Sequence, residues 1–164
     1  MTTTESIDGS VARERFAELF RQHIHFKDNP YHPLVWILGN PEIGEGTSIG
    51  GISEINAIGA NIRIGRQCDI GSFVAINVAD SHMRAIGIKD SIEARDIYIG
   101  DNVFIGSHVV VLGGSEIGHH SVIAAGTTVR GEKVPPYSLV VGNPAIVKSA
   151  YYEKRVKTSR MTKA

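Results

Sequence analysis

The chain has 164 residues with 17 basic and 17 acidic side chains, so its formal net charge is zero, which argues against a nucleic-acid binder. It contains no run of 18 apolar residues and no N-terminal apolar segment, so we expect no membrane span and a cytoplasmic protein. The 21 Ile and 15 Val far outnumber the 5 Leu, which favours an all-β core, and the lone Cys68 excludes an internal disulfide.

The first predicted element is an amphipathic helix over residues 10–26. Phe16, Leu19 and Ile24 recur at helical spacing among charged side chains, and Asp8 or Ser10 is the candidate N-cap. A helix of this length is marginal alone. We therefore expect it to pack on an open end of the fold or on a neighbouring subunit.

Residues 37–76 carry an aliphatic residue at every sixth position, with one slip of three. The recurring residues are Ile37, Ile43, Ile49, Ile55, Ile58, Ile64, Ile70 and Ile76. An even period places positions i and i+4 on one side of an extended strand, and the two remaining positions must turn a corner. Pairs such as Glu45-Gly46 and Ala60-Asn61 suit the left-handed backbone of such a corner. Three six-residue sides would close one triangular turn of a coil.

The segment 78–96 interrupts this period. Ile76 and Ile99 are 23 residues apart, which is not a multiple of six. We therefore predict that the segment leaves the coil as an extruded loop.

Residues 99–129 resume the period without a break. The recurring residues are Ile99, Ile105, Val111, Ile117, Ile123 and Val129. The alternative is a β-sandwich, but its strands repeat at about 8–12 residues with no fixed phase. Six consecutive matches at one phase favour the coil.

These patterns divide the chain into three parts: an N-terminal helical segment (1–36), a hexapeptide coil (37–134) with its loop 78–96, and a C-terminal tail (135–164). The tail ends in a basic stretch whose role the sequence leaves open. Its cations are Lys154, Arg155, Lys157, Arg160 and Lys163.

The run from Asp96 to Lys148 resembles the hexapeptide-repeat acyltransferases, and within them the branch of maltose, galactoside and xenobiotic acetyltransferases. The repeat alone specifies only the fold. The Pro135-Pro136-Tyr137 and Gly142-Asn143-Pro144-Ala145 ending, together with a histidine in an extruded loop, is more specific to acyl transfer.

That resemblance implies a left-handed parallel β-helix with an N-terminal helix and a short C-terminal tail or helix. It also implies a homotrimer with active sites between neighbouring coils. The activity implied is acetyl transfer from acetyl-CoA to a hydroxyl or amino group of a sugar, free or nucleotide-linked. The sequence does not distinguish O- from N-acetylation, nor does it identify the acceptor.

His82 is the candidate general base, because it stands where the family carries its catalytic histidine and because imidazole titrates near neutral pH. A solvated loop histidine is the alternative. Asp80 is a candidate for orienting the ring, and Asn77 and Arg84 are candidate substrate contacts. Cys68 falls in an inward slot, which predicts a buried filler and hence direct attack in a ternary complex. The other histidines are predicted to be surface or helix residues: His23, His25, His32, His108, His119 and His120.

The resemblance also carries acetyl-CoA contacts onto seven positions. They are Gly106, Ser107, Ala125, Arg130, Lys133, Pro144 and Lys148. Small residues would let the pantetheine arm lie close to the coil, and the cations would meet the phosphates. The alternative is that these charges are simply solvated.

Two other functions are compatible with such a coil. A γ-carbonic anhydrase-like zinc enzyme needs three histidines, two of them five residues apart. Gly113 stands five residues after His108, so we expect no metal. A non-catalytic scaffold would have no use for the charged loop 78–96.

Overall fold

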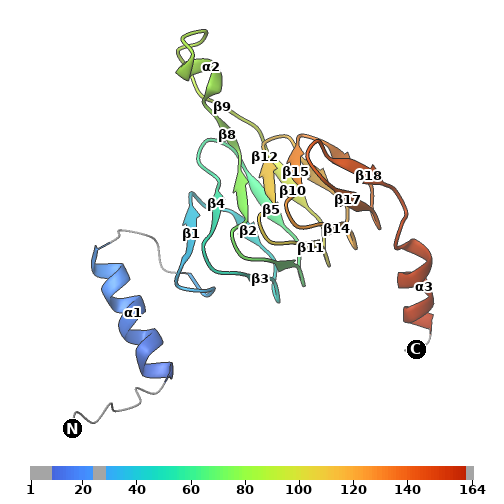
Figure 1. Ribbon diagram of the computed structural model, residues 1–164, viewed down its shortest axis with the longest axis horizontal. Coiled ribbons are helices and arrows are strands. Elements are labelled where there is room, and N and C mark those ends of the chain that lie inside the picture. The colour runs from blue at the N-terminus through green and yellow to red at the C-terminus, as the bar shows by residue number, and fades with distance from the viewer. Residues whose placement is uncertain (1–8, 24–28, 162–164) are drawn as a thin grey trace.

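The computed structural model describes residues 9–23 and 29–161, and its strands build a left-handed parallel β-helix of triangular section (Figure 1). Each turn of the coil gives one short strand to each of three sheets. Sheet A contains β1 (Val35–Leu38), β4 (Ser53–Asn56), β7 (Ala75–Asn77), β12 (Val110–Leu112) and β15 (Thr128–Arg130). Sheet B contains β2 (Glu42–Ile43), β5 (Ile62–Ile64), β10 (Ile97–Ile99), β13 (Glu116–Ile117) and β16 (Lys133–Val134). Sheet C contains β3 (Ser48–Ile49), β6 (Asp69–Ile70), β11 (Phe104–Ile105), β14 (Val122–Ile123), β17 (Leu139–Val141) and β18 (Ile146–Lys148).

The remaining elements lie outside the coil. β8 (Ala79–Asp80) and β9 (Glu93–Ala94) pair antiparallel, as do β17 and β18 at the C-terminal end of sheet C. The helices are α1 (Gly9–His23), α2 (His82–Ala85) and α3 (Glu153–Met161). Within the described residues, no helix is long and apolar enough to cross a membrane.

The register between turns reports the length of each turn. Ile37 pairs with Ile55, and Val111 pairs with Val129, so these turns take the full 18 residues that three hexapeptides require. Ile64 pairs with Ile99, and the additional residues of that turn form the loop 78–96. The prediction of an extruded loop is confirmed.

The interior is filled by the predicted aliphatic residues and, nearer the corners, by small ones. Ile55, Ile76, Ile105 and Ile123 are completely buried. Small polar residues also point inward, and their hydroxyls hydrogen-bond backbone groups of the next turn. Ser53 is an example, since its Oγ donates to the Gly71 oxygen and accepts from the Val74 N–H at 3.1 Å each. Polar atoms in the core are therefore satisfied between turns.

The corners use the left-handed backbone conformation more widely than the sequence predicts. Seven corner residues other than glycine have positive φ: Ile52, Gln67, Phe73, Asn102, His108, His120 and Tyr137. Each turn holds the next in place; the Gln67 N–H, for instance, donates to the Glu45 oxygen at 3.0 Å. Hydrogen bonding between turns therefore outweighs the local preference for glycine and asparagine.

One inward assignment from the sequence is wrong. Ile58 is exposed, because the slip of three residues lies in the turn around it; the left-handed residue there is Gly59, not Asn61. Near the end of the coil, Lys133 is exposed, while the next residue, Val134, is buried and pairs with Ile117. The turn from Ile117 to Val134 is one residue shorter than 18, so the inward position falls on Val134.

The N-terminal helix begins at Gly9, so Ser10 lies inside its first turn rather than at the N-cap. Asp8, Ile24 and His25 lie outside the described residues. Val11, Phe16 and Leu19 are exposed on the helix, which stands apart from the coil in Figure 1.

Candidate functional site

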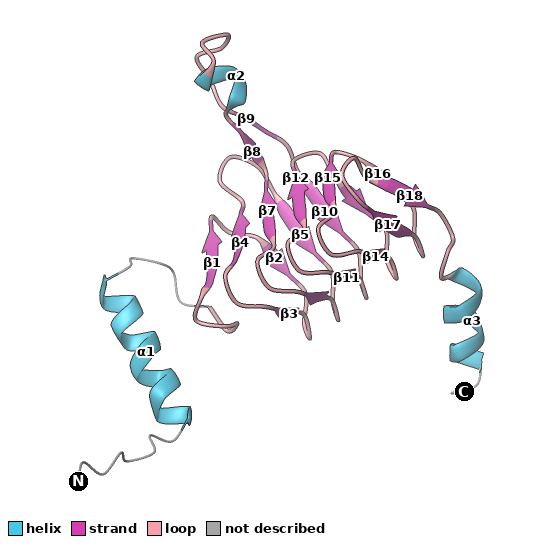
Figure 2. Cartoon of the chain, in the orientation of Figure 1, coloured by secondary structure: helices cyan, strands magenta, loops and turns pink. Residues whose placement is uncertain are grey.

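The loop 78–96 rises from the coil on a two-stranded stem formed by β8 and β9 (Figure 2). The Val78 N–H donates to the Asn56 oxygen of the preceding turn at 3.2 Å. The Val78 oxygen accepts the Arg95 N–H at 3.1 Å, which closes the base of the stem. Because the stem is tied to sheet A at its base, Asp80 and His82 are held at the edge of the coil.

Asp80 and His82 form a hydrogen-bonded pair. Asp80 Oδ1 lies 2.5 Å from His82 Nδ1 and also accepts the His82 backbone N–H at 3.1 Å. The hydrogen bond from the His82 ring is the main cause that holds the pKa of Asp80 below its ordinary value, and the charge of Arg95 adds to it. An ionised carboxylate can only accept, so Nδ1 carries the hydrogen and Nε2 keeps a free lone pair.

A pocket of about 570 Å³ opens beside this pair. It is lined by Val78, Ala79, Asp80, Ser81, His82, Arg95, Leu112, Gly113 and Arg130. Leu112 and Arg130 pair in register on neighbouring turns of sheet A. One imidazole, one carboxylate and two guanidinium groups therefore share one pocket between the loop and the coil.

Gly113 allows the loop to lie this close to the coil. A Cβ at this position would lie 2.6 Å from the Val78 oxygen and 3.0 Å from the Arg95 oxygen. Both oxygens are backbone atoms at the base of the stem, so a side chain would push the stem outward. The glycine is required here for close approach of two backbone segments.

The other two loop candidates do not line the pocket. Asn77 accepts the Ala79 N–H at 2.9 Å through its side-chain oxygen, which shapes the turn leading into the loop. Arg84 is exposed on α2. Of the four predicted loop residues, only Asp80 and His82 lie together in the pocket.

The predicted coenzyme contacts fall on several parts of the coil. Gly106 and Ala125 stack on successive turns, where a Cβ on Gly106 would lie 2.5 Å from the Ala125 nitrogen. Ser107 belongs to the same corner, since its oxygen accepts the Gly126 N–H at 3.0 Å. These small residues form one smooth strip at the corner between sheets C and A.

The charged members of that set lie on three different sheets. Arg130 ends β15 in sheet A, where its guanidinium contacts Asn143 Oδ1 at 3.5 Å, one residue before Pro144. Lys133 lies in sheet B and forms a 3.0 Å ion pair with Glu116. Lys148 ends β18 in sheet C. Only Arg130 joins the pocket of His82.

Lys133 instead lines a second, shallower pocket of about 690 Å³ on the outer face of sheet B, with Arg63, Tyr98 and Pro135 among the other lining residues. The neighbouring side chains on this face pair with each other, as Arg63 does with Glu42 at 3.0 Å. The lysine and arginine side chains that line this pocket are therefore already paired with carboxylates. No two of its lining residues form a proton-transfer pair.

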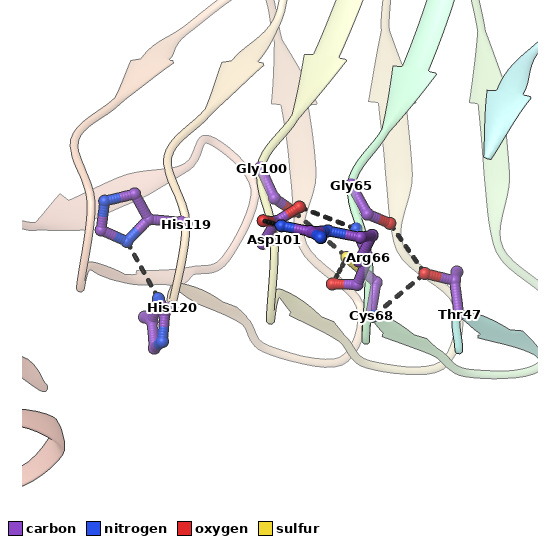
Figure 3. A network of polar contacts seen from close by, with 8 residues as sticks. All are labelled: Thr47, Gly65, Arg66, Cys68, Gly100, Asp101, His119 and His120. Atoms are coloured by element: carbon purple, nitrogen blue, oxygen red, sulfur yellow. Dashed lines mark hydrogen bonds and ion pairs between the residues drawn. The ribbon is translucent and has the colours of Figure 1, made fainter. Parts of the chain in front are cut away.

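A polar network occupies the corner between sheets B and C (Figure 3). Cys68 is buried there with its sulfur 3.2 Å from the Gly100 oxygen, and burial raises the pKa of its thiol. Asp101 pairs with Arg66 at 3.3 Å, and the Nδ1 atoms of His119 and His120 lie 2.9 Å apart. The neutral, buried thiol fits a structural role.

No cluster of three or more His, Cys, Asp and Glu side chains with a metal-binding arrangement occurs in the described ranges.

Comparison with known proteins places this fold among transferases. The family described as "Bacterial transferase hexapeptide (six repeats)" matches residues 96–131. An acetyltransferase of Vibrio cholerae described as containing the hexapeptide repeat has a similar structure, with a TM-score of 0.57, 29% identity and coverage of 88% of this chain and 81% of that chain. The chain is therefore similar to the hexapeptide-repeat transferases, and their repeat matches its residues 96–131.

Other similar proteins include a member of the branch that the sequence predicts, that of the maltose, galactoside and xenobiotic acetyltransferases. A maltose O-acetyltransferase of Clostridium difficile 630 has a TM-score of 0.56 and 25% identity, covering 87% of this chain and 88% of that one. A Staphylococcus aureus (strain COL) protein named "putative acetyltransferase" is 43% identical over 77 residues, which are 47% of this chain and 37% of that protein. The chain thus spans 37% of the length of the first curated relatives that it matches.

The sequence analysis did not assign Arg95 and Gly113 to the site. Arg95 follows the second strand of the stem, 13 positions beyond His82, and Gly113 lies on the next turn of sheet A. The glycine pair at 113–114 marks a corner in the sequence, but nothing in the repeat indicates that the loop stem rests on it. Only antiparallel pairing of β8 with β9 brings Arg95 beside His82.

Proposed function

We propose that the protein is an acetyl-CoA-dependent acetyltransferase whose acceptor is a hydroxyl or amino group of a sugar, free or nucleotide-linked. The observation that carries the proposal is the His82–Asp80 pair in a pocket lined by Arg95 and Arg130, on the coil of a hexapeptide-repeat transferase. The similar proteins named above support the acyl-transfer chemistry. The Vibrio cholerae acetyltransferase has also been crystallised with acetyl coenzyme A.

In this mechanism His82 is the general base. Its Nε2 removes the proton from the acceptor oxygen or nitrogen as that atom attacks. Asp80 keeps the hydrogen on Nδ1, holds the ring in place and stabilises the imidazolium that forms. Attack on the thioester carbonyl of acetyl-CoA would form the new C–O or C–N bond as the C–S bond breaks. The imidazolium of His82 would then return the proton to the departing thiolate, and CoA would leave as its free thiol. Because Cys68 is buried and its pKa is raised, we propose direct attack without an acyl-enzyme.

The coenzyme would lie between two copies of the chain. Gly106 lets the backbone of Ala125 stack closely on it, and the small side chain of Ala125 lies exposed at this corner, where a pantetheine arm could run; Lys148 is exposed to meet a phosphate. Lys133 lies in sheet B, whereas Lys148 lies in sheet C of the same coil. One coenzyme that contacts both lysines would therefore bridge neighbouring coils. This arrangement supports a homotrimer with its sites at the interfaces.

The proposal is tested by thiol release from acetyl-CoA in the presence of a panel of sugars. His82→Ala should lower kcat by about 10²- to 10⁴-fold, because it removes the general base. The matched control is His108→Asn, which changes a corner histidine stacked on Phe73 (ring centroids 4.7 Å apart) and keeps a residue type that tolerates positive φ.

Folding and oligomeric state of both variants would be compared by circular dichroism and sedimentation. Undiminished turnover in a folded His82→Ala variant would remove His82 from the mechanism.

A further inference from the structure

The pocket around His82 contains more positive than negative charge. Arg95 and Arg130 line it, whereas Asp80 is its one carboxylate, and that carboxylate is hydrogen-bonded to the His82 ring. Neither guanidinium forms an ion pair within the part of the chain that the structure describes; the Arg130 side chain bonds only the neutral Asn143. The charge of Arg95 lowers the pKa of Asp80 and of Glu93, but neither carboxylate forms an ion pair with its guanidinium. The guanidinium donors therefore remain available to bind an anion.

Arg95 is held in position by its backbone and by two glycine corners. Its N–H donates to the Val78 oxygen, and its guanidinium lies over the corners of two successive turns. A Cβ on Gly114 would lie 3.2 Å from Arg95 Nη1, and one on Gly131 would lie 3.8 Å from the same atom. The absence of side chains at these corners leaves room for the guanidinium. Arg95 remains exposed, so its donors are accessible to a ligand.

The phosphates of acetyl-CoA do not account for this charge. The pantetheine arm separates the thioester from the pyrophosphate by much more than the width of a pocket of about 570 Å³. If the thioester is beside His82, as the proposed function requires, the pyrophosphate lies outside the pocket. The group that meets Arg95 must then belong to the acceptor.

We infer that the acceptor carries an anionic group, a carboxylate or a phosphate, which Arg95 binds in the pocket beside His82. This inference rests on the proposed function and narrows its substrate class to acidic or phosphorylated sugars. The planar guanidinium offers two parallel N–H donors, which match the two oxygens of either group. Arg130 lines the same pocket and adds a second positive charge.

The test compares acceptor pairs that differ only in the anion. Glucuronic acid is compared with glucose, and N-acetylglucosamine 1-phosphate with N-acetylglucosamine, so the two pairs distinguish a sugar carboxylate from a sugar phosphate. We expect the wild-type enzyme to favour the charged member of at least one pair by about tenfold or more in kcat/KM. Arg95→Gln should lower kcat/KM for the charged member by about tenfold more than for the neutral member, so that the preference is lost. Arg95→Lys should retain part of it, because the charge remains but the paired donors are lost.

The matched control is Lys154→Gln, which removes one positive charge from α3, away from the pocket. It should leave the preference intact. Equal kcat/KM for charged and neutral members, or an equal loss for both in Arg95→Gln, would overturn the inference and leave the proposed function standing.

Binding in the absence of acetyl-CoA separates this inference from the proposed function. Calorimetry should show weaker binding of the preferred anionic acceptor to Arg95→Gln, with acetyl-CoA binding unchanged. Anion binding that depends on Arg95, without any acetyl transfer, would contradict the proposed function alone. Loss of acetyl-CoA binding in Arg95→Gln would instead assign Arg95 to the coenzyme and overturn the inference.

Discussion

Asp80 and His82 are two residues apart, and one oxygen of Asp80 contacts both the ring and the backbone N–H of His82. The backbone contact fixes where α2 begins, and the ring contact fixes which nitrogen carries the hydrogen. The same carboxylate therefore shapes the loop and, in the proposed mechanism, prepares His82 to act as the base. This double role is possible only while Asp80 is ionised.

The pKa of Asp80 is lowered, chiefly by the His82 hydrogen bond, so its interaction is present above the ordinary Asp pKa of about 3.9. It is lost only as the pH falls through the still lower folded value. Between about pH 5 and 8 Asp80 does not titrate. We therefore expect Asp80→Asn to lower kcat throughout that window, by about tenfold or more.

The measurement is the pH profile of kcat for the wild type and Asp80→Asn. If the variant matched the wild type above pH 6 and fell behind only in acid, Asp80 would not act by holding the ring. A normal circular dichroism spectrum would show that the loss does not come from unfolding.

At the scale of elements, the stem of β8 and β9 connects the irregular loop to the regular coil. The stem is short, with two residues in each strand, and its base depends on Val78, Arg95 and the bare backbone of Gly113. Changes at the glycine should therefore alter both the stability of the coil and the position of the pocket.

Gly113→Ala should lower the free energy of unfolding by about 1–3 kcal/mol, because a Cβ 2.6 Å from the Val78 oxygen forces the backbone to shift. Turnover should fall as well, since Arg95 and the stem move with it. Thermal melting and acetyl-transfer assays measure the two effects.

Gly87→Ala is the matched control for this prediction. Gly87 has open space around it and a φ of +75°, so alanine adds local strain in the loop but no clash with the coil. It should retain turnover. A Gly113→Ala protein with wild-type melting and turnover would contradict the role of the glycine contact.

The molecule as a whole leaves its candidate site open on one side. The side chains of His82 and Asp80 are 63% and 47% exposed in the single chain. Val11, Phe16 and Leu19 on α1 are exposed too, and apolar side chains at helical spacing need a surface to cover them. These features support assembly into the proposed homotrimer.

We expect the protein to sediment at roughly three times its chain mass of 17.7 kDa. Turnover per chain should fall on dilution to concentrations at which the trimer dissociates, because in the proposed arrangement each site is completed by a neighbouring copy. Sedimentation velocity and assays over the same dilution series test this. A monomer with full turnover would show that one chain builds a complete site.

The sequence by itself determined the coil, most of the inward aliphatic residues and the loop that carries His82. These features are local: the side-chain alternation of a strand specifies which residues point inward, and a lapse in the period of six marks a loop wherever it occurs. A resemblance to the hexapeptide-repeat acyltransferases added the hand of the coil, which periodicity does not contain.

Only the tertiary structure decided which residues meet at the pocket. Arg95 reaches His82 through antiparallel pairing in the stem, and Gly113 supports both from another turn of the coil. Such contacts depend on the length of every intervening turn. Turns that deviate from 18 residues placed Ile58 at the surface and made Val134 the inward residue. A six-residue pattern specifies each strand but does not fix how much chain each corner takes, and corner length sets which side chains become neighbours.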